Sequence, residues 1–171
     1  GITPRPERTY KPKELDALGP MNWQPFAAPD LKVLNVDGKP VTLTDYRGKN
    51  VILVFFLGEA CVHCVGQLKS INDKMADFEK QGTVVLGVCS ASPEKLKDSA
   101  TLNKVKINFL SDTAHENARR FSSYDDFEEM ELHSTILIDK NGLIRWKRTG
   151  GDPFMNIDFL LNEVKRVNGT P

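Results

Sequence analysis

The most constraining feature of this sequence is a long apolar run followed by a helical pattern and a second apolar run. Residues 51–57 (VILVFFL) are continuously β-branched, aliphatic or aromatic, which is typical of a central strand covered on both faces. Across residues 61–80 the apolar positions recur every three or four residues, which indicates one face of a helix. Residues 83–88 form the second apolar run. This order predicts a right-handed βαβ unit with two parallel strands.

Two β-hairpins are expected on either side of this unit. Residues 31–43 place apolar positions around Asp37-Gly38, a dipeptide typical of tight hairpin turns. Residues 135–146 repeat the arrangement around a polar turn at 139–142. Strands and helices alternate through much of the chain. We therefore expect an α/β domain around a central sheet, with a β-hairpin extension on its N-terminal side.

Short polar signals predict where the other helices begin and end. Residues 92–94 (SPE) combine a cap residue, a proline at the first helical position and an acidic first turn. Thr113 and Glu116 resemble a capping box at the start of another helix. Asp-Pro at residues 152–153 predicts the start of the last helix, which we expect to end before Gly169.

The distribution of proline and acidic residues suggests the domain organisation. Six of the ten prolines lie within residues 1–29, a pattern that predicts an extended arm or linker, or else an ordered arm lying on the domain. We expect residues 30–171 to form one folded domain, because a chain of this length can bury a core without disulfides or metals. Five acidic residues between positions 124 and 131 predict a solvated loop or helix face.

Composition and charge argue against two classes of function. Lys plus Arg and Asp plus Glu both number 23, so the basic footprint of a nucleic-acid binder is lacking. The apolar run at residues 51–57 is far shorter than the roughly 20 residues of a membrane-spanning helix, so we expect no membrane insertion. The chain starts at Gly1 and leads in with prolines, which suggests a processed N-terminus and an extracytoplasmic location, periplasmic or secreted.

The motif that carries chemistry is CVHC at residues 61–64, directly after the predicted central strand, where open α/β sheets place their functional crevices. Two cysteines three positions apart in the first helical turn can close a disulfide, and the helix N-terminus favours a thiolate at Cys61. A protonated His63 would lower the thiol pKa further. Because Cys64 lies on the apolar stripe, we predict that Cys61 attacks the substrate and Cys64 resolves the mixed disulfide.

Two further residues, Glu59 and Cys89, have both a structural and a functional interpretation, and a third, His115, has a structural one. Glu59 is expected to be a solvated carboxylate, with proton acceptance near the sulfurs as the alternative. Cys89, at the end of the second predicted strand, is expected to be a small buried residue, with a third redox thiol as the alternative. His115 is expected on a helix surface.

Seven segments of the chain resemble the peroxiredoxin-type proteins of the thioredoxin-like superfamily, the alkyl hydroperoxide reductase and thiol-specific antioxidant (AhpC/TSA, or redoxin) group. The matching segments are 28–30 (APD), 43–49 (LTDYRGK), 51–56 (VILVFF), 61–68 (CVHCVGQL), 87–94 (GVCSASPE), 109–112 (FLSD) and 135–142 (TILIDKNG). The resemblance spans residues 26–167 and implies a thioredoxin fold, in which helices flank a central mixed sheet. It also implies a thiol-dependent enzyme that acts on a disulfide-containing protein or a small peroxide. Such an enzyme is recycled by a thiol reductant and needs no bound cofactor.

The resemblance also assigns roles to individual residues. It aligns Cys64 with the peroxidatic cysteine and Cys61 with the threonine that normally stands three residues earlier, while Leu57 replaces the usual proline. This order of attack reverses the one predicted from helix position, and both orders stay open. His133 stands where the family has an active-site arginine, or where thioredoxins have a cis-proline, and so becomes a candidate active-site residue.

Three functions are compatible with these residues. The first is thiol–disulfide exchange or antioxidant reduction through a Cys61/Cys64 couple. The second is a peroxiredoxin reaction, in which peroxide oxidises Cys64 to sulfenic acid and Cys61 resolves it. The third is copper binding or copper delivery, as in the copper chaperones that share the thioredoxin fold. Here Cys61, Cys64 and His133, with or without His63, would form a thiolate–imidazole site for copper or zinc.

Overall fold

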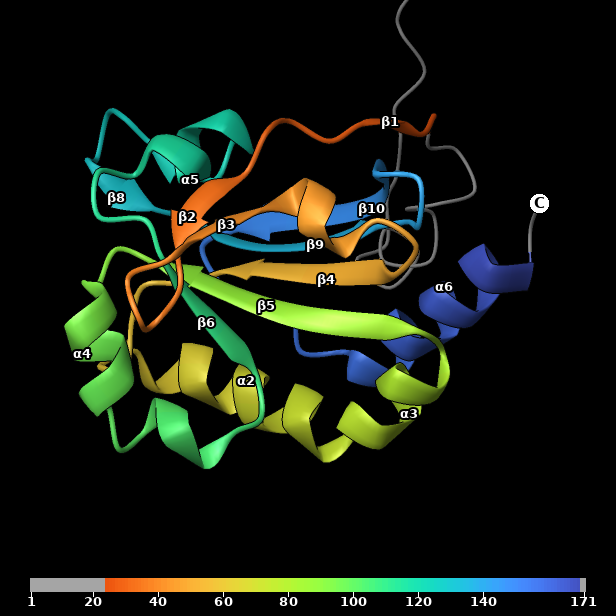
Figure 1. Ribbon diagram of the computed structural model, residues 1–171, viewed down its shortest axis with the longest axis horizontal. Helices are drawn as coiled ribbons and strands as arrows, with labels where there is room; N and C mark the ends of the chain where they lie inside the picture. The colour runs from red at the N-terminus through yellow and green to blue at the C-terminus, as the bar shows by residue number, and fades with distance from the viewer. Residues whose placement is uncertain (1–23, 170–171) are drawn as a thin grey trace, which may run out of the picture.

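The computed structural model describes residues 24–169, which fold around a mixed eight-stranded sheet (Figure 1). The strands lie in the order β1-β10-β9-β4-β5-β6-β2-β3. Their bounds are β1 Phe26–Ala27, β2 Lys32–Leu34, β3 Pro40–Thr42, β4 Asn50–Phe55, β5 Thr83–Cys89, β6 Asn108–Ser111, β9 His133–Ile138 and β10 Leu143–Gly150. Two further short strands, β7 Tyr124–Asp125 and β8 Met130–Glu131, pair with each other in a separate small sheet.

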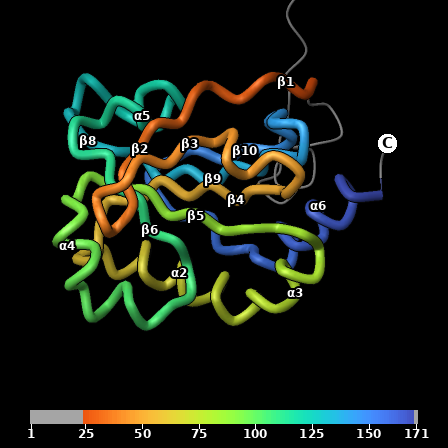
Figure 2. The backbone as a smooth tube through the Cα atoms, viewed as in Figure 1, coloured from red at the N-terminus to blue at the C-terminus, as the bar shows by residue number. Residues whose placement is uncertain are grey.

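Helices cover both faces of the large sheet. They are α2 Val62–Asp73, α3 Met75–Lys80, α4 Pro93–Asp98, α5 Glu116–Arg120 and α6 Ile157–Gly169, together with the short 3-10 helices η1 Leu43–Tyr46 and η2 Leu102–Lys104. In Figure 1, α2, α3 and α6 lie on one side of the sheet and α5 lies on the other. The backbone trace in Figure 2 shows α4 and β8 at one end of the molecule and the C-terminal end of α6 at the opposite end.

Strand β4 forms the centre of the fold, as its apolar sequence predicts. All of its residues are buried, and it pairs in parallel with β5 and antiparallel with β9. Because successive side chains of a strand point to opposite faces, the strand contributes to two cores. Ile52 and Val54 pack in the core that contains α2 and α6. Leu53 and Phe55 pack in the core on the α5 side. The first of these cores also buries the apolar face of α2.

The predicted βαβ unit and both hairpins are confirmed. Strands β4 and β5 pair in parallel, and α2 and α3 connect them along the chain. Strands β2 and β3 pair antiparallel around a turn in which Gly38 has a φ of 75°, a conformation that favours glycine. Strands β9 and β10 form the second hairpin, and β10 continues to Gly150. The result is the expected α/β architecture, a central mixed sheet flanked by helices with an N-terminal β-hairpin extension.

Two helices differ in length from the prediction. The helix expected across residues 61–80 is divided at Lys74, whose backbone angles (φ −106°, ψ 10°) leave the helical region. The last helix begins at Ile157 rather than directly after the Asp-Pro pair at 152–153, and it continues through Gly169. In both places the apolar pattern continues, or nearly continues, across the observed end of the helix. The end is therefore set by local backbone geometry and not by a change in that pattern.

The start of α5 was predicted incorrectly. His115 occupies the N-cap position, so Thr113 and Glu116 do not form the expected capping box. Instead, the buried carboxylate of Asp112 accepts hydrogen bonds from the backbone N–H groups of Asn117 and Ala118, at 3.2 and 2.9 Å. An acceptor before the helix therefore satisfies donors that a cap residue usually satisfies.

The acidic segment 124–131 was also predicted incorrectly in part. It contains the β7–β8 hairpin, and Glu131 is buried rather than solvated. Of the proline-rich arm, residues 1–23 lie outside the described residues, and Phe26–Ala27 near its end form β1, antiparallel to β10. Within residues 24–169, no helix is long and apolar enough to cross a membrane.

Candidate active site

The CVHC motif lies at the N-terminus of α2, immediately beyond the end of β4. Cys61 is the N-cap residue, and its sulfur accepts a hydrogen bond from the backbone N–H of Cys64 at 3.3 Å. Residues 58–60 (GEA), immediately before Cys61, provide no serine, threonine, aspartate or asparagine to cap the helix. The sulfur of Cys61 therefore takes the place of the usual oxygen, next to the positive end of the helix dipole.

The two cysteines of the motif form a disulfide, with their Cα atoms 5.3 Å apart. Cys61 is half-buried, whereas the side chain of Cys64 is 0% exposed and packs in the core beneath α2. This difference agrees with the helix stripe, which places Cys64 on the apolar face. Of the two sulfurs, Cys61 is the one that a substrate can reach.

His133, the first residue of β9, contacts both sulfurs, although it lies 72 positions after Cys61 and 69 positions after Cys64 in the chain. Its Nε2 atom lies 2.7 Å from the Sγ of Cys64 and 3.7 Å from the Sγ of Cys61. Its Nδ1 atom lies 2.7 Å from the backbone carbonyl of Gly151. Because a carbonyl only accepts hydrogen bonds, Nδ1 carries the ring proton of the neutral imidazole. Nε2 then presents its lone pair to the sulfurs.

The antiparallel pairing of β4 and β9 positions this histidine. Phe55, the last residue of β4, pairs with Ser134 of β9, so the start of β9 and the end of β4 lie at the same edge of the sheet. His133 is buried, which shields its ring from competing water. His133, the candidate active-site residue from the family resemblance, therefore lies beside both sulfurs, and its role stays a prediction.

Two polar residues that no sequence motif singled out join α2 to β9 beside the site. The side-chain amide of Gln67 donates a hydrogen bond to the hydroxyl of Thr135 at 2.7 Å, and both residues are buried. Gln67 lies one helical turn after Cys64, and Thr135 lies two positions after His133 on the same face of the strand. In the sequence, the sign that could have indicated a role for Gln67 was its position as a polar residue next to the apolar stripe of the helix. This bond fixes the position of α2 relative to β9 and so supports the contact between Cys64 and His133.

His63 and Glu59 are not brought to the sulfurs in the same way. His63 is exposed on α2, and the cluster of metal-ligating side chains found among residues 24–169 contains Cys61, Cys64 and His133 but not His63. Glu59 is exposed and accepts a hydrogen bond from the hydroxyl of Ser99. The predicted influence of His63 on the thiols therefore stays a prediction.

Cys89 is buried at the end of β5, as expected for a small core residue. Burial raises the pKa of its thiol to about 11, and the nearby carboxylates of Glu131, Glu59 and Asp112 act in the same direction. A hydrogen bond with the backbone of Ala91 opposes this effect only in part. Cys89 therefore stays protonated at physiological pH.

A second titratable cluster lies between β8 and the start of α5. Glu131 is buried, and its carboxylate lies 3.0 Å from Nδ1 of His115. Burial raises the pKa of Glu131 to about 7, although the His115 hydrogen bond lowers it and the Asp112 charge raises it further. His115, predicted on a helix surface, is the N-cap of α5 with a left-handed φ of 58°, and its ring packs at a tilt against that of Tyr124.

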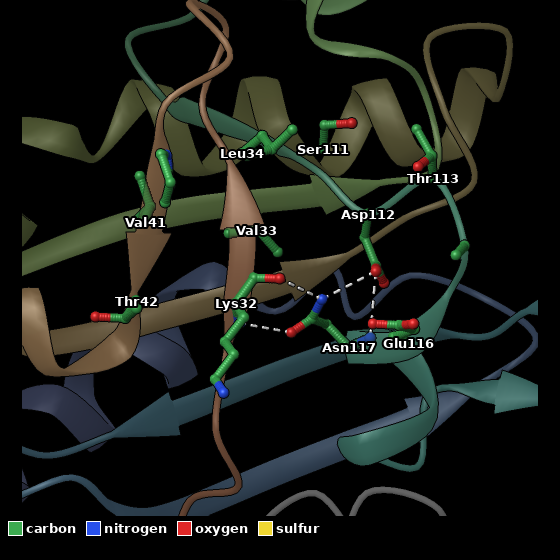
Figure 3. A pocket seen from close by; sticks show the side chains of 12 residues that line it. Lys32, Val33, Leu34, Val41, Thr42, Ser111, Asp112, Thr113, Glu116 and Asn117 are labelled. Carbon is green, nitrogen blue, oxygen red and sulfur yellow. Dashed lines mark hydrogen bonds between the residues drawn. The ribbon is translucent and has the colours of Figure 1, made fainter.

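A separate cavity of about 370 Å³ lies between β2, β3 and the start of α5 (Figure 3). The side chain of Asn117 bridges the backbone N–H and carbonyl of Lys32, at 2.7 and 2.8 Å, and also bonds Asp112 at 3.0 Å. Figure 3 shows these bonds converging on Asn117. The side chain of Asn117 is thus engaged in holding β2 to α5, and none of the residues that line the cavity is a cysteine or histidine.

Comparison with known proteins places the chain in a family. The sequence profile of the AhpC/TSA family matches residues 26–147. The chain belongs to this family. Peroxiredoxin Bcp of Escherichia coli (strain K12) is 30% identical over 144 residues, which cover 81% of this chain and 92% of that protein. The expected AhpC/TSA membership is therefore confirmed.

Solved structures of proteins named as peroxiredoxins share the fold. Peroxidoxin BcpB from Mycobacterium tuberculosis superposes with a TM-score of 0.74 at 16% identity, covering 84% of this chain and 96% of that one. Peroxiredoxin Q from Xanthomonas campestris gives a TM-score of 0.72 at 18% identity, covering 81% and 91% of the two chains. The expected thioredoxin fold is confirmed. AhpC/TSA membership and the Cys61–Cys64 disulfide together make this chain a thiol-based redox protein.

Proposed function

We propose that the protein is a thiol–disulfide oxidoreductase in which Cys61 attacks the substrate and Cys64, assisted by His133, completes the reaction. The observation that carries this proposal is the contrast between the two sulfurs. Cys61 is half-exposed at the helix N-terminus, whereas Cys64 is 0% exposed and lies 2.7 Å from Nε2 of His133. The substrate is a disulfide-containing protein, and an external thiol reductant regenerates the dithiol.

The first half of the reaction takes place at Cys61. Backbone N–H groups and the dipole at the start of α2 stabilise its thiolate, which attacks one sulfur of the substrate disulfide. A Cys61–substrate mixed disulfide forms, and the other substrate sulfur leaves as a thiolate that takes a proton from water. Cys64 is too buried to take part in this step.

The second half of the reaction takes place between Cys64 and the mixed disulfide. Nε2 of His133 accepts the proton of the Cys64 thiol, and the resulting thiolate attacks the sulfur of Cys61. The Cys61–Cys64 disulfide forms and the remaining substrate thiolate leaves, taking a proton from the imidazolium of His133. The carbonyl of Gly151 keeps Nδ1 protonated, so that Nε2 is the nitrogen that exchanges the proton. A thiol reductant then returns two electrons and two protons to the enzyme.

Reduction of a small peroxide is the second candidate, favoured by the similarity to proteins named peroxiredoxins. In that reaction the Cys61 thiolate attacks the terminal peroxide oxygen, becomes a sulfenic acid and releases water or an alcohol after proton transfer. Cys64 then condenses with the sulfenic acid and releases water, which leaves the same disulfide. The burial of Cys64 favours Cys61 as the sulfur that meets peroxide, although the family alignment gives that position to Cys64.

Stopped-flow kinetics with four variants test this assignment against both substrates. We expect Cys61→Ser to abolish reduction of insulin disulfides and consumption of hydrogen peroxide. Cys64→Ser should react once and accumulate a mixed disulfide that mass spectrometry detects. His133→Gln should slow release from that mixed disulfide by about 100-fold, the usual size of a lost general base. His63→Gln, the matched substitution at an exposed histidine, should change the rate far less.

The results separate the alternatives. Insulin reduction much faster than peroxide consumption supports the exchange enzyme, and the reverse supports the peroxidase. Loss of the first chemical step in Cys64→Ser, with that step retained in Cys61→Ser, would show that the order of attack is wrong.

A further inference from the structure

The two sulfurs and the imidazole of the site also form a set of metal-ligand atoms. One ligand atom from each of Cys61, Cys64 and His133 lies within 4.8 Å of the others. The three residues come from two rigid elements, the first turn of α2 and the first position of β9. Sites on such elements hold their ligands more accurately than sites on loops.

The outer contacts of this cluster orient its ligand atoms before any ion binds. Nδ1 of His133 donates to the carbonyl of Gly151 at 2.7 Å, which directs the lone pair of Nε2 toward the sulfurs. Metal-binding histidines almost always donate their second ring nitrogen to a carbonyl, a carboxylate or water. The N–H of Cys64 donates to the sulfur of Cys61 at 3.3 Å, a contact that stabilises negative charge on a thiolate ligand. The Gln67–Thr135 bond fixes the spacing of helix and strand.

The donor set favours a soft ion of low coordination number. Two thiolates and one imidazole suit Cu(I), which binds soft ligands, whereas structural Zn(II) sites take four protein ligands. Among residues 24–169, this cluster contains no fourth cysteine, histidine or carboxylate. The side chains of Cys64 and His133 are 0% and 8% exposed, which limits the access of water as an additional ligand.

We propose that the reduced protein binds one Cu(I) ion through the sulfurs of Cys61 and Cys64 and through Nε2 of His133. Binding displaces the two thiol protons and changes no oxidation state, so it needs neither an oxidant nor a reductant once the dithiol exists. The disulfide form has no thiolate to offer, so copper binding and disulfide formation exclude each other. This site is additional to the proposed exchange reaction and does not depend on it.

Anaerobic competition with the Cu(I) chelator bicinchoninate tests the proposal. Reduced full-length protein should remove one equivalent of Cu(I) from the coloured chelator complex, and the same protein oxidised to the disulfide should remove none. X-ray absorption at the copper edge should show two sulfur ligands and one nitrogen ligand. His133→Gln should lower the Cu(I) affinity by at least about tenfold and remove the nitrogen signal. The exposed His63→Gln control should retain the wild-type affinity and spectrum.

Three outcomes would overturn the proposal: no copper removed by the reduced wild-type protein, an unchanged nitrogen signal in His133→Gln, or stoichiometric binding of Zn(II) in preference to Cu(I). Circular dichroism of each variant, together with its ability to form the Cys61–Cys64 disulfide, excludes misfolding as the cause of a loss. Insulin reduction is measured on the same preparations. Exchange without copper binding would contradict only the metal site, and copper binding without exchange would contradict only the proposed function.

Discussion

At the scale of single residues, the three cysteines differ because each sulfur has different neighbours. Cys61 lies at a helix N-terminus and is half-exposed, while Cys64 is buried against the ring nitrogen of His133. Cys89 is buried in the core, near carboxylates that oppose its ionisation. Because the thiolate is the reactive form, these surroundings should decide which cysteine reacts.

We predict that Cys89 is alkylated far more slowly than Cys61. A pKa of about 11 leaves only about one thiolate in a thousand at pH 8, compared with about a quarter for an ordinary exposed cysteine. Iodoacetamide labelling of the reduced native protein, followed by peptide mass spectrometry, should modify Cys61 at least about 100-fold faster than Cys89. In urea, all three cysteines should react at similar rates. Equal labelling of Cys61 and Cys89 in the native protein would refute the expectation.

At the scale of elements, α2 and β5 show how tightly the strand layer packs compared with the helix. Gly87 of β5 pairs with Val54 on one side and with Phe109 on the other. A Cβ atom at Gly87 would lie 2.9 Å from two ring carbons of Phe109 and 3.3 Å from one of Phe56. At Gly66 of α2, a Cβ would meet nothing within 4 Å. The same added methyl group should therefore have opposite effects at the two positions.

We predict that Gly87→Ala destabilises the protein by about 1–2 kcal/mol. Overpacking a filled core costs about 1–3 kcal/mol, and the lower entropy of the unfolded alanine chain offsets part of this cost. Gly66→Ala is the matched control and should stabilise the protein by up to about 1 kcal/mol, because alanine favours an α-helix more than glycine does. Urea unfolding measures both changes. A stabilised Gly87→Ala variant would show that the ring of Phe109 moves aside without cost.

At the scale of the whole molecule, the buried Glu131 should make stability depend on pH. The groups that interact with this carboxyl are His115, Asp112 and Cys89. Burial raises the pKa of Glu131 from 4.5 to about 7, so between these values the folded protein keeps a proton that the unfolded chain has lost. The contribution of Glu131 to stability is therefore greatest at low pH and declines as the pH rises through this range.

We predict that Glu131→Gln removes this decline, because glutamine does not ionise and can still accept the hydrogen bond from His115. Between pH 5 and pH 8, the free energy of unfolding of the wild-type protein should fall relative to that of the variant by about 2 kcal/mol. The exposed Glu128→Gln serves as control and should follow the wild-type curve. Parallel wild-type and Glu131→Gln curves in urea titrations across this range would contradict the assignment.

Much of the frame follows from local patterns in the sequence. The apolar run at residues 51–57 predicts the buried central strand, and the Asp37-Gly38 turn predicts the first hairpin. The spacing of apolar residues after position 61 places Cys64 on the buried face of its helix. These features depend on residues close together in the chain, where backbone geometry and side-chain period suffice. The prediction of a capping box at Thr113 was wrong because the carboxylate of Asp112 accepts hydrogen bonds from the N–H groups in the first turn of α5.

By itself, the sequence determined the family, the α/β frame and the pair of cysteines that can close a bridge, because all three are encoded in short contiguous segments. Only the tertiary structure decided which nitrogen of His133 faces the sulfurs, since that depends on the carbonyl of Gly151, just after the end of β10. It also buried Glu131 beside His115. Contacts between distant segments decide protonation and burial, and these in turn govern the chemistry proposed for this site.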